Sequence, residues 1–283
     1  MKKNIIYNLL GLFVLLFAFT ACEFETAEQD VSDIISPNNK PTVTVTSSNA
    51  SGTVEEGETV VYTITFDKPI ERAVTFTPTI VSGTNDHDFE LDAVTLAPYT
   101  TSVQLPIAIL EDYEIEGQEN LSIQIEISSI AEKNLVHPDT AFAPIDLTIN
   151  DFVDDNKLVV NFSWAEDIDF DILVFSDTAT YPATLWGTGG ATGANPEIDT
   201  SIWLDDPAGD YYVCILDWWE GINFDYTFDL AFPDGSVQTI TGTFNGTTYP
   251  YTSFTGPASW GSPTAYKVLK VVNNNSTFTV TKL

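Results

Sequence analysis

Five carboxylates crowd one ten-residue stretch, EDYEIEGQEN at residues 111–120. Two like charges about 4 Å apart cost roughly 4 kcal/mol at an effective dielectric near 20, so a cluster of this kind favours a bound cation. Ca²⁺ takes about six to eight oxygen ligands, which loops with several carboxylates can supply. The stretch therefore indicates a calcium site, although solvated loops could spread the same acids apart without an ion.

Three further acids, Asp167, Asp169 and Asp171, alternate with apolar residues in EDIDFDILVF. Alternate side chains of a strand share one face, so the three carboxylates are expected together at the rim of a sheet. Asp205 or Asp206 from another loop could complete a second possible metal site there. A solvated strand end is the alternative interpretation.

Tryptophans are confined to the C-terminal part of the chain, and two of them, Trp218 and Trp219, are adjacent. Neighbours on a regular strand cannot both point inward, so at least one is expected to be exposed, near Asp217 and Glu220. Exposed aromatic rings beside carboxylates are typical of sugar-binding surfaces. Trp218 and Trp219 are therefore possible ligand-binding residues, while core packing accounts for most of the other tryptophans.

Motifs for catalysis are scarce. The chain has two histidines, His87 and His137, and contains no G-x-S-x-G, H-E-x-x-H or P-loop sequence. Cys214 lies in the apolar stretch YYVCIL, which is typical of a core residue. We therefore expect no enzyme and no catalytic residues, although paired carboxylates alone can in principle cleave glycosides.

The first 21 residues have the layout of a signal peptide, with Lys2 and Lys3 before an apolar run that is too short to span a bilayer comfortably. They end in Phe-Thr-Ala before Cys22, which resembles the bacterial lipobox and implies that Cys22 is lipidated. A plain signal peptide with an incidental cysteine is the alternative.

Residues 22–40 are acidic, poor in large apolar side chains and end in a Pro-Asn-Asn turn, as expected of a flexible tether. An acidic run after a lipidated cysteine resembles the surface-export signal of some Gram-negative lipoproteins. The expected location is thus the cell envelope, with a lipid anchor in the membrane, at the outer membrane or the cell surface.

The composition is that of a globular protein. Of 283 residues, 43% are hydrophobic and only 18% are charged, which is enough for two hydrophobic cores. The formal net charge of −31 repels phosphate backbones and attracts cations, so nucleic acid is excluded as the expected partner.

Residues 41–155 alternate polar and apolar side chains in short runs such as VVYTITF, SVQLPIAIL and LSIQIEIS, each bounded by Gly, Pro, Asn or Asp. Six or seven such strands predict an antiparallel β-sandwich. Residues 157–283 repeat the strand pattern in KLVVNFSW, DYYVCIL and FDYTFDLAF, among others, which predicts a second, jelly-roll-like β-sandwich. The fold class expected is all-β, with two tandem sandwiches.

The first of these segments resembles a Calx-β domain, the immunoglobulin-like sandwich first named for sodium–calcium exchangers. The resemblance rests on EEGETVVYTITF, SGTNDHDFEL, AILEDYEIEGQENLSIQI and LTIND. It implies that acids from these four places meet around calcium at one end of the sandwich. The metal ligands that it implies are Glu56, Asp88, Glu111, Asp112, Glu116, Glu119 and Asp151. The sequence departs from the family pattern at Tyr113, where a third acid often stands, and after Asp151.

The second segment weakly resembles bacterial pre-peptidase C-terminal domains, through a Trp followed by the alternating aspartates and then by PAGDYYV. Together these features predict a non-catalytic, calcium-binding lipoprotein of the cell envelope or cell surface that acts as an adhesion or binding module. The alternative is a glycan-capture surface lipoprotein working beside a transporter or a secreted hydrolase. The partner would then be a glycan or protein ligand.

Overall fold

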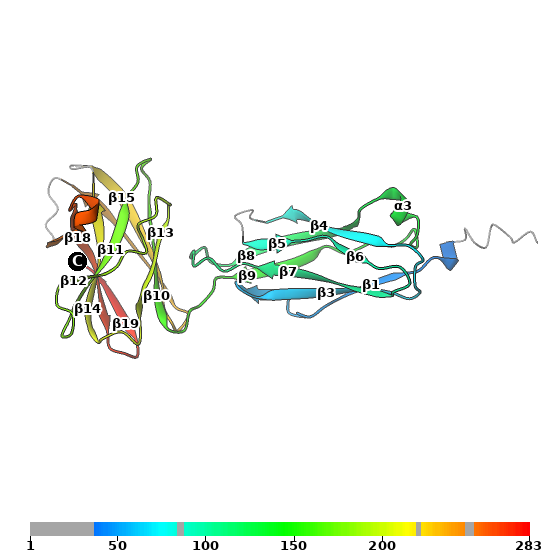
Figure 1. Cartoon of the computed structure of the whole chain (residues 1–283), viewed down its shortest axis with the longest axis horizontal. Coiled ribbons are helices and arrows are strands. Elements are labelled where there is room, and N and C mark those ends of the chain that lie inside the picture. Colours follow the sequence, from blue (N-terminus) through cyan, green and yellow to red (C-terminus); the bar gives the residue numbers. More distant parts are fainter. Residues whose placement is uncertain (1–36, 84–87, 219–221, 247–251) are drawn as a thin grey trace, which may run out of the picture.

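The computed structural model describes residues 37–83, 88–218, 222–246 and 252–283. The predicted signal peptide, Cys22, most of the tether, His87 and Trp219 lie outside these residues. Two β-sandwiches follow one another along the long axis of the molecule and are joined by residues 151–156 (Figure 1). None of the helices in the described ranges has the length and hydropathy that a membrane crossing needs.

The first sandwich is formed by two sheets whose strands run in the orders β1-β3-β7-β5 and β2-β9-β8-β4-β6. All pairs are antiparallel except β2 with β9. The elements are η1 (Pro37–Asn39), β1 (Val43–Ser47), β2 (Thr53–Glu55), β3 (Thr59–Phe66), β4 (Val74–Ser82), β5 (Phe89–Leu91), β6 (Val94–Leu96), β7 (Ser102–Ile109), β8 (Glu119–Ile127), α3 (Ile130–Lys133) and β9 (Ile145–Asn150).

Alternating burial explains why these strands form a sandwich. In β8, Leu121, Ile123 and Ile125 point into the core while the residues between them face outward. The same pattern in β3 and β7 buries Ile64 and Leu105 fully. Because neighbouring strands are antiparallel, the end of β7, the start of β8, the start of β5 and the end of β9 meet at one end of the sandwich, the end that faces the second sandwich (Figure 1).

The second sandwich is formed by a four-stranded sheet, β13-β10-β15-β16, and a six-stranded sheet in which β19 joins the path β12-β11-β14-β18-β17 by pairing with β18. Its elements are β10 (Lys157–Trp164), β11 (Asp171–Thr178), β12 (Thr184–Gly187), β13 (Glu197–Trp203), β14 (Gly209–Asp217), β15 (Asn223–Ala231), β16 (Val237–Asn245), β17 (Ser253–Thr255), η2 (Ala258–Trp260), β18 (Thr264–Asn273) and β19 (Phe278–Lys282).

Its core lies between the two sheets and is rich in aromatic rings, among them Phe162, Phe228 and Tyr211. A smaller cluster that includes Phe175 and Cys214 lies on the other face of the six-stranded sheet, beneath Phe254 and Trp260. The prediction of an all-β chain with tandem sandwiches is confirmed. The alternating aspartates differ from expectation, because β11 begins only at Asp171 and the residues before it are not in a strand.

Candidate metal centre

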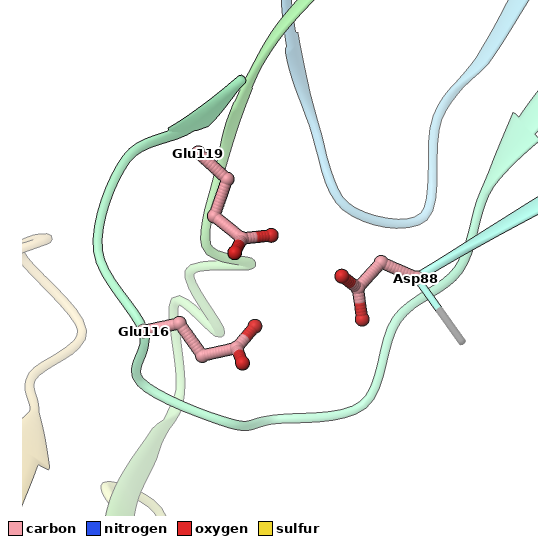
Figure 2. A group of neighbouring side chains, drawn as sticks. All are labelled: Asp88, Glu116 and Glu119. Carbon is pink, nitrogen blue, oxygen red and sulfur yellow. The ribbon is translucent and has the colours of Figure 1, made fainter. Parts of the chain in front are cut away.

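Three carboxylates converge at the end of the first sandwich that faces the second. Asp88 immediately precedes β5, Glu116 lies in the acidic turn between β7 and β8, and Glu119 is the first residue of β8. Figure 2 shows the three side chains pointing into one space. One oxygen from each lies within 4.8 Å of the others. Oxygens that share one Ca²⁺ at about 2.4 Å can be no farther apart than that, so the spacing fits a single ion.

Glu56 and Asp151 extend this group. Glu56 is 4% exposed, and its Oε2 accepts a hydrogen bond from the Phe152 backbone N–H (3.2 Å). Burial, as the largest cause, together with the nearby carboxylates of Asp112, Asp151 and Asp88, raises the pKa of Glu56 to about 8. The pKa of Asp151 is also raised, chiefly by burial, although the Gly117 N–H donates to its Oδ2 (3.1 Å) and opposes the shift.

Like charges surround Glu116 as well. Burial, as the largest cause, together with the charges of Glu119, Asp88 and Asp112, raises its pKa to about 7. The side chain of Glu116 is nevertheless exposed, so an ion could reach it from solvent. These carboxylates come from four separate segments of the chain, and they repel one another as a single cluster.

The two remaining acids predicted for the site lie at its edge. Asp112 is exposed, and its Oδ1 accepts a hydrogen bond from the Glu114 N–H (2.7 Å) while its charge acts on Glu56 and Glu116. Glu111 is exposed too, with its Oε2 beside Gly57, the residue after Glu56. The structure thus places six of the seven predicted residues in mutual electrostatic contact, with Glu111 next to them.

The donor set decides which cation suits this site. All the converging side chains offer carboxylate oxygens, which are hard ligands preferred by Ca²⁺ and Mg²⁺, whereas zinc sites use Cys and His. Carboxylates on several loops allow the large, adaptable coordination shell of Ca²⁺ more readily than the strict octahedron of Mg²⁺. The residues present therefore fit calcium.

A second group of carboxylates is formed by Asp169, Asp171 and Glu197, again with oxygens within 4.8 Å of one another. Within the described part of the chain, Asp167, Asp205 and Asp206 do not belong to this group. Glu197, which the sequence pattern did not indicate, is fully buried at the start of β13.

Protein donors already bind this second group. Glu197 accepts hydrogen bonds from the backbone of Thr192, Gly193 and Ala194 and from the Thr192 hydroxyl, at 2.7 to 3.1 Å. Trp218 Nε1 donates to Asp171 Oδ2 (2.7 Å). Burial raises the pKa of Asp171. The arrangement anchors the loop before β13, and it makes a cation site here less favourable than at the first group.

Trp218 has the exposure that its sequence position predicted, at 37%. Its ring lies 6.3 Å from that of Trp260, tilted by 35°, and its N–H is engaged by Asp171. The two indoles therefore form a small aromatic surface beside a carboxylate.

Solved structures align with the chain at low similarity. CBD12 from CALX1.2 aligns with 13% identity over 63% of this chain and 76% of its own, with a TM-score of 0.27. The calcium binding domain CBD12 of CALX1.1 aligns with 14% identity over 60% and 80%, with a TM-score of 0.26. A two-domain protein of unknown function from Bacteroides fragilis aligns with 9% identity over 91% and 90%, with a TM-score of 0.31.

No family model matches the chain, and no curated protein matches it either. The resemblances to Calx-β and pre-peptidase C-terminal domains therefore stay predictions from sequence motifs.

Proposed function

We propose that this protein is a non-catalytic, lipid-anchored module of the cell envelope or cell surface, whose first sandwich binds calcium and whose second offers a surface for adhesion or ligand binding. The observation that carries the proposal is the convergence of Asp88, Glu116 and Glu119 on one space, with Glu56 and Asp151 next to them. The pKa values of Glu56 and Glu116 are raised by burial and by neighbouring carboxylates, so a divalent cation would relieve a repulsion built into the fold.

The non-catalytic part of the proposal is supported by the state of the free cysteine in the described residues. Cys214 is fully buried, and burial raises its pKa far above the ordinary value, so its thiol is inert. His137 lies beside Asp139 on a loop of the first sandwich, away from the carboxylate cluster. The anchor and the location rest on the lipobox-like sequence at Cys22.

Calorimetric titration of the purified chain with calcium chloride tests the metal site. We expect saturable binding that is lost or strongly weakened when both Glu116 and Glu119 are replaced by Gln. Glu126→Gln is the matched control, because Glu126 is an exposed acid on the same strand as Glu119, seven residues farther along β8 and thus roughly 23 Å away. Absence of calcium binding at millimolar concentration, or equal binding by the double variant, would refute the site.

Glycan capture is the second candidate, favoured by the aromatic surface of Trp218 and Trp260 beside Asp171. Stacking of a sugar ring on such a surface needs an accessible indole, and Trp218 is 37% exposed. A glycan array probed with the wild type and with Trp218→Ala, in calcium and in chelator, tests this. Binding that survives the substitution would assign the glycan to another surface.

A further inference from the structure

The acidic turn between β7 and β8 is held from outside its own domain. Asn161, on β10 of the second sandwich, is 5% exposed. With its amide oriented so that donor faces acceptor, its Nδ2 donates to the Tyr113 carbonyl (3.1 Å) and its Oδ1 accepts from the Ile115 N–H (2.7 Å). One side chain thus binds the backbone on both sides of Glu114, in the manner of a strand partner.

Tyr113 shows why the turn needs such support. Its φ of 65° lies in the left-handed region, which is unfavourable for a residue with a side chain. Backbone conformations of this kind persist only where the surroundings over-determine them. Here Lys157 Nζ donates to the Tyr113 hydroxyl (2.8 Å), and its ammonium lies between the rings of Tyr113 and Trp203, 4.8 and 4.7 Å from their centroids. Phe152 packs edge-on against the Tyr113 ring.

The residues held in this way flank the candidate ligands. Asp112 precedes Tyr113 and Glu116 follows Ile115, so the backbone atoms that Asn161 binds set the directions of both carboxylates. Gly117, one residue farther, donates to Asp151. A shift of the turn would therefore move Asp112 and Glu116 relative to Asp88 and Glu119, which are fixed at strand ends.

We infer that Asn161 is a positioning residue for the cation site, so that the second sandwich sets the calcium affinity of the first. This inference rests on the proposed function. Tyr113 stands where the Calx-β pattern that this segment resembles often has a further acid. Here its hydroxyl and carbonyl instead contact Lys157 and Asn161 of the second sandwich. Linkage makes the effect reciprocal: calcium strengthens the contact between the sandwiches by the same factor by which the contact strengthens calcium binding.

The test compares calcium affinity in the full chain carrying Asn161→Leu with that of the wild type. Loss of two hydrogen bonds that position the turn should weaken binding roughly tenfold, since each such bond is worth a factor of several in an equilibrium constant. Asn195→Leu is the control, because the Asn195 side chain also donates to a backbone carbonyl of the second sandwich, that of Trp164 (2.9 Å), at the opposite end of β10 from Lys157. The control should bind within about twofold of the wild type.

A second readout separates positioning from a general loss of stability. Luminescence lifetimes of bound Eu³⁺ in H₂O and D₂O count the waters on the ion, and a displaced turn should add at least one in Asn161→Leu and none in Asn195→Leu. Asn161→Ser, which is smaller and polar, is measured in parallel so that the result does not depend on folding of the Leu variant. Wild-type affinity and hydration number in a folded Asn161 variant would overturn the inference alone. Failure of the wild type to bind calcium would instead remove the proposed function.

Discussion

Replacement of Glu56 by Gln tests the electrostatic reasoning directly. Gln has the shape of Glu and an oxygen that can still accept the hydrogen bond from the Phe152 N–H, but it carries no charge. The substitution therefore removes the buried carboxylate from among Asp112, Asp151 and Asp88 and leaves the packing in place.

The magnitude follows from the pKa of Glu56, which rises from 4.5 to about 8 in the folded, cation-free protein. Between these values the folded state keeps a proton that the unfolded chain has released, so the free energy of unfolding falls as the pH rises through this window and levels off above it. Each pKa unit corresponds to about 1.4 kcal/mol, so the full loss is on the order of 5 kcal/mol. Glu56→Gln escapes this loss and should be more stable than the wild type at pH 8.5 without calcium.

In calcium, the wild type should be more stable than Glu56→Gln, the reverse of the order without calcium. The cation binds the ionised carboxylate and restores stability to the wild type, whereas the variant lacks one ligand and gains less. Scanning calorimetry in metal-free buffer and in calcium, at pH 5 and pH 8.5, measures both effects. Calorimetry is needed because all six tryptophans lie beyond residue 160, so their fluorescence reports the second sandwich only.

Two results would refute this reasoning. Stability of the cation-free wild type that does not fall between pH 5 and pH 8.5 would mean that Glu56 is not a strained buried acid. A Glu56→Gln variant less stable than the wild type at pH 8.5 without calcium would mean that its negative charge is already compensated within the protein. Glu126→Gln, an exposed acid outside the cluster, should follow the wild type in every condition.

Three other predictions concern Glu197, Lys157 and Cys22. Glu197→Gln should destabilise the second sandwich by about 2 to 3 kcal/mol in urea unfolding followed by tryptophan fluorescence, because three backbone N–H groups and a hydroxyl lose a charged acceptor; an unchanged midpoint would contradict this. Lys157→Met should broaden the distribution of shapes in small-angle X-ray scattering, with and without calcium. Lys270→Met, which removes an ion pair within the second sandwich, should not. Equal scattering from both variants would show that Lys157 does not fix the junction between the sandwiches. Cells fed labelled palmitate should label the wild type but not Cys22→Ala, and label persisting in the variant would disprove the lipobox.

Much of the fold follows from local pattern. Period-two alternation in stretches such as VVYTITF and LSIQIEIS predicts β3 and β8, because one face of each strand must be buried. The three-residue strands β2, β5, β6 and β17 have too few residues for a pattern to appear, and they form only because longer neighbours offer them an edge. The alternation before β11 is misleading, since residues 165–168 form a bend and Asp169 and Phe170 lie in no strand.

The candidate site could likewise be predicted only in part from the sequence. The acidic turn is apparent as a run of carboxylate residues, and the motif resemblance adds Glu56, Asp88 and Asp151 from distant positions. Glu197 and Asn161 leave no such signal, because each is a single polar residue at or within a strand and its role depends on which loop of another segment packs against it. Contacts of this kind are long-range and not periodic, so they can be inferred only from the fold.

The two carboxylate groups show why acidity alone does not define a metal site. In the second sandwich, Glu197 and Asp171 receive N–H and O–H donors from the protein, and the donors take the place that a cation would fill. In the first, burial raises the pKa of Glu116, and the charges that act on it are those of other carboxylates, which raise it as well. Such an arrangement is unfavourable for the protein alone and becomes favourable once a cation binds. Because the fold gathers mutually repelling acids at the end of one domain and holds their turn with Asn161 of the next, calcium binding and domain contact are expected to depend on each other.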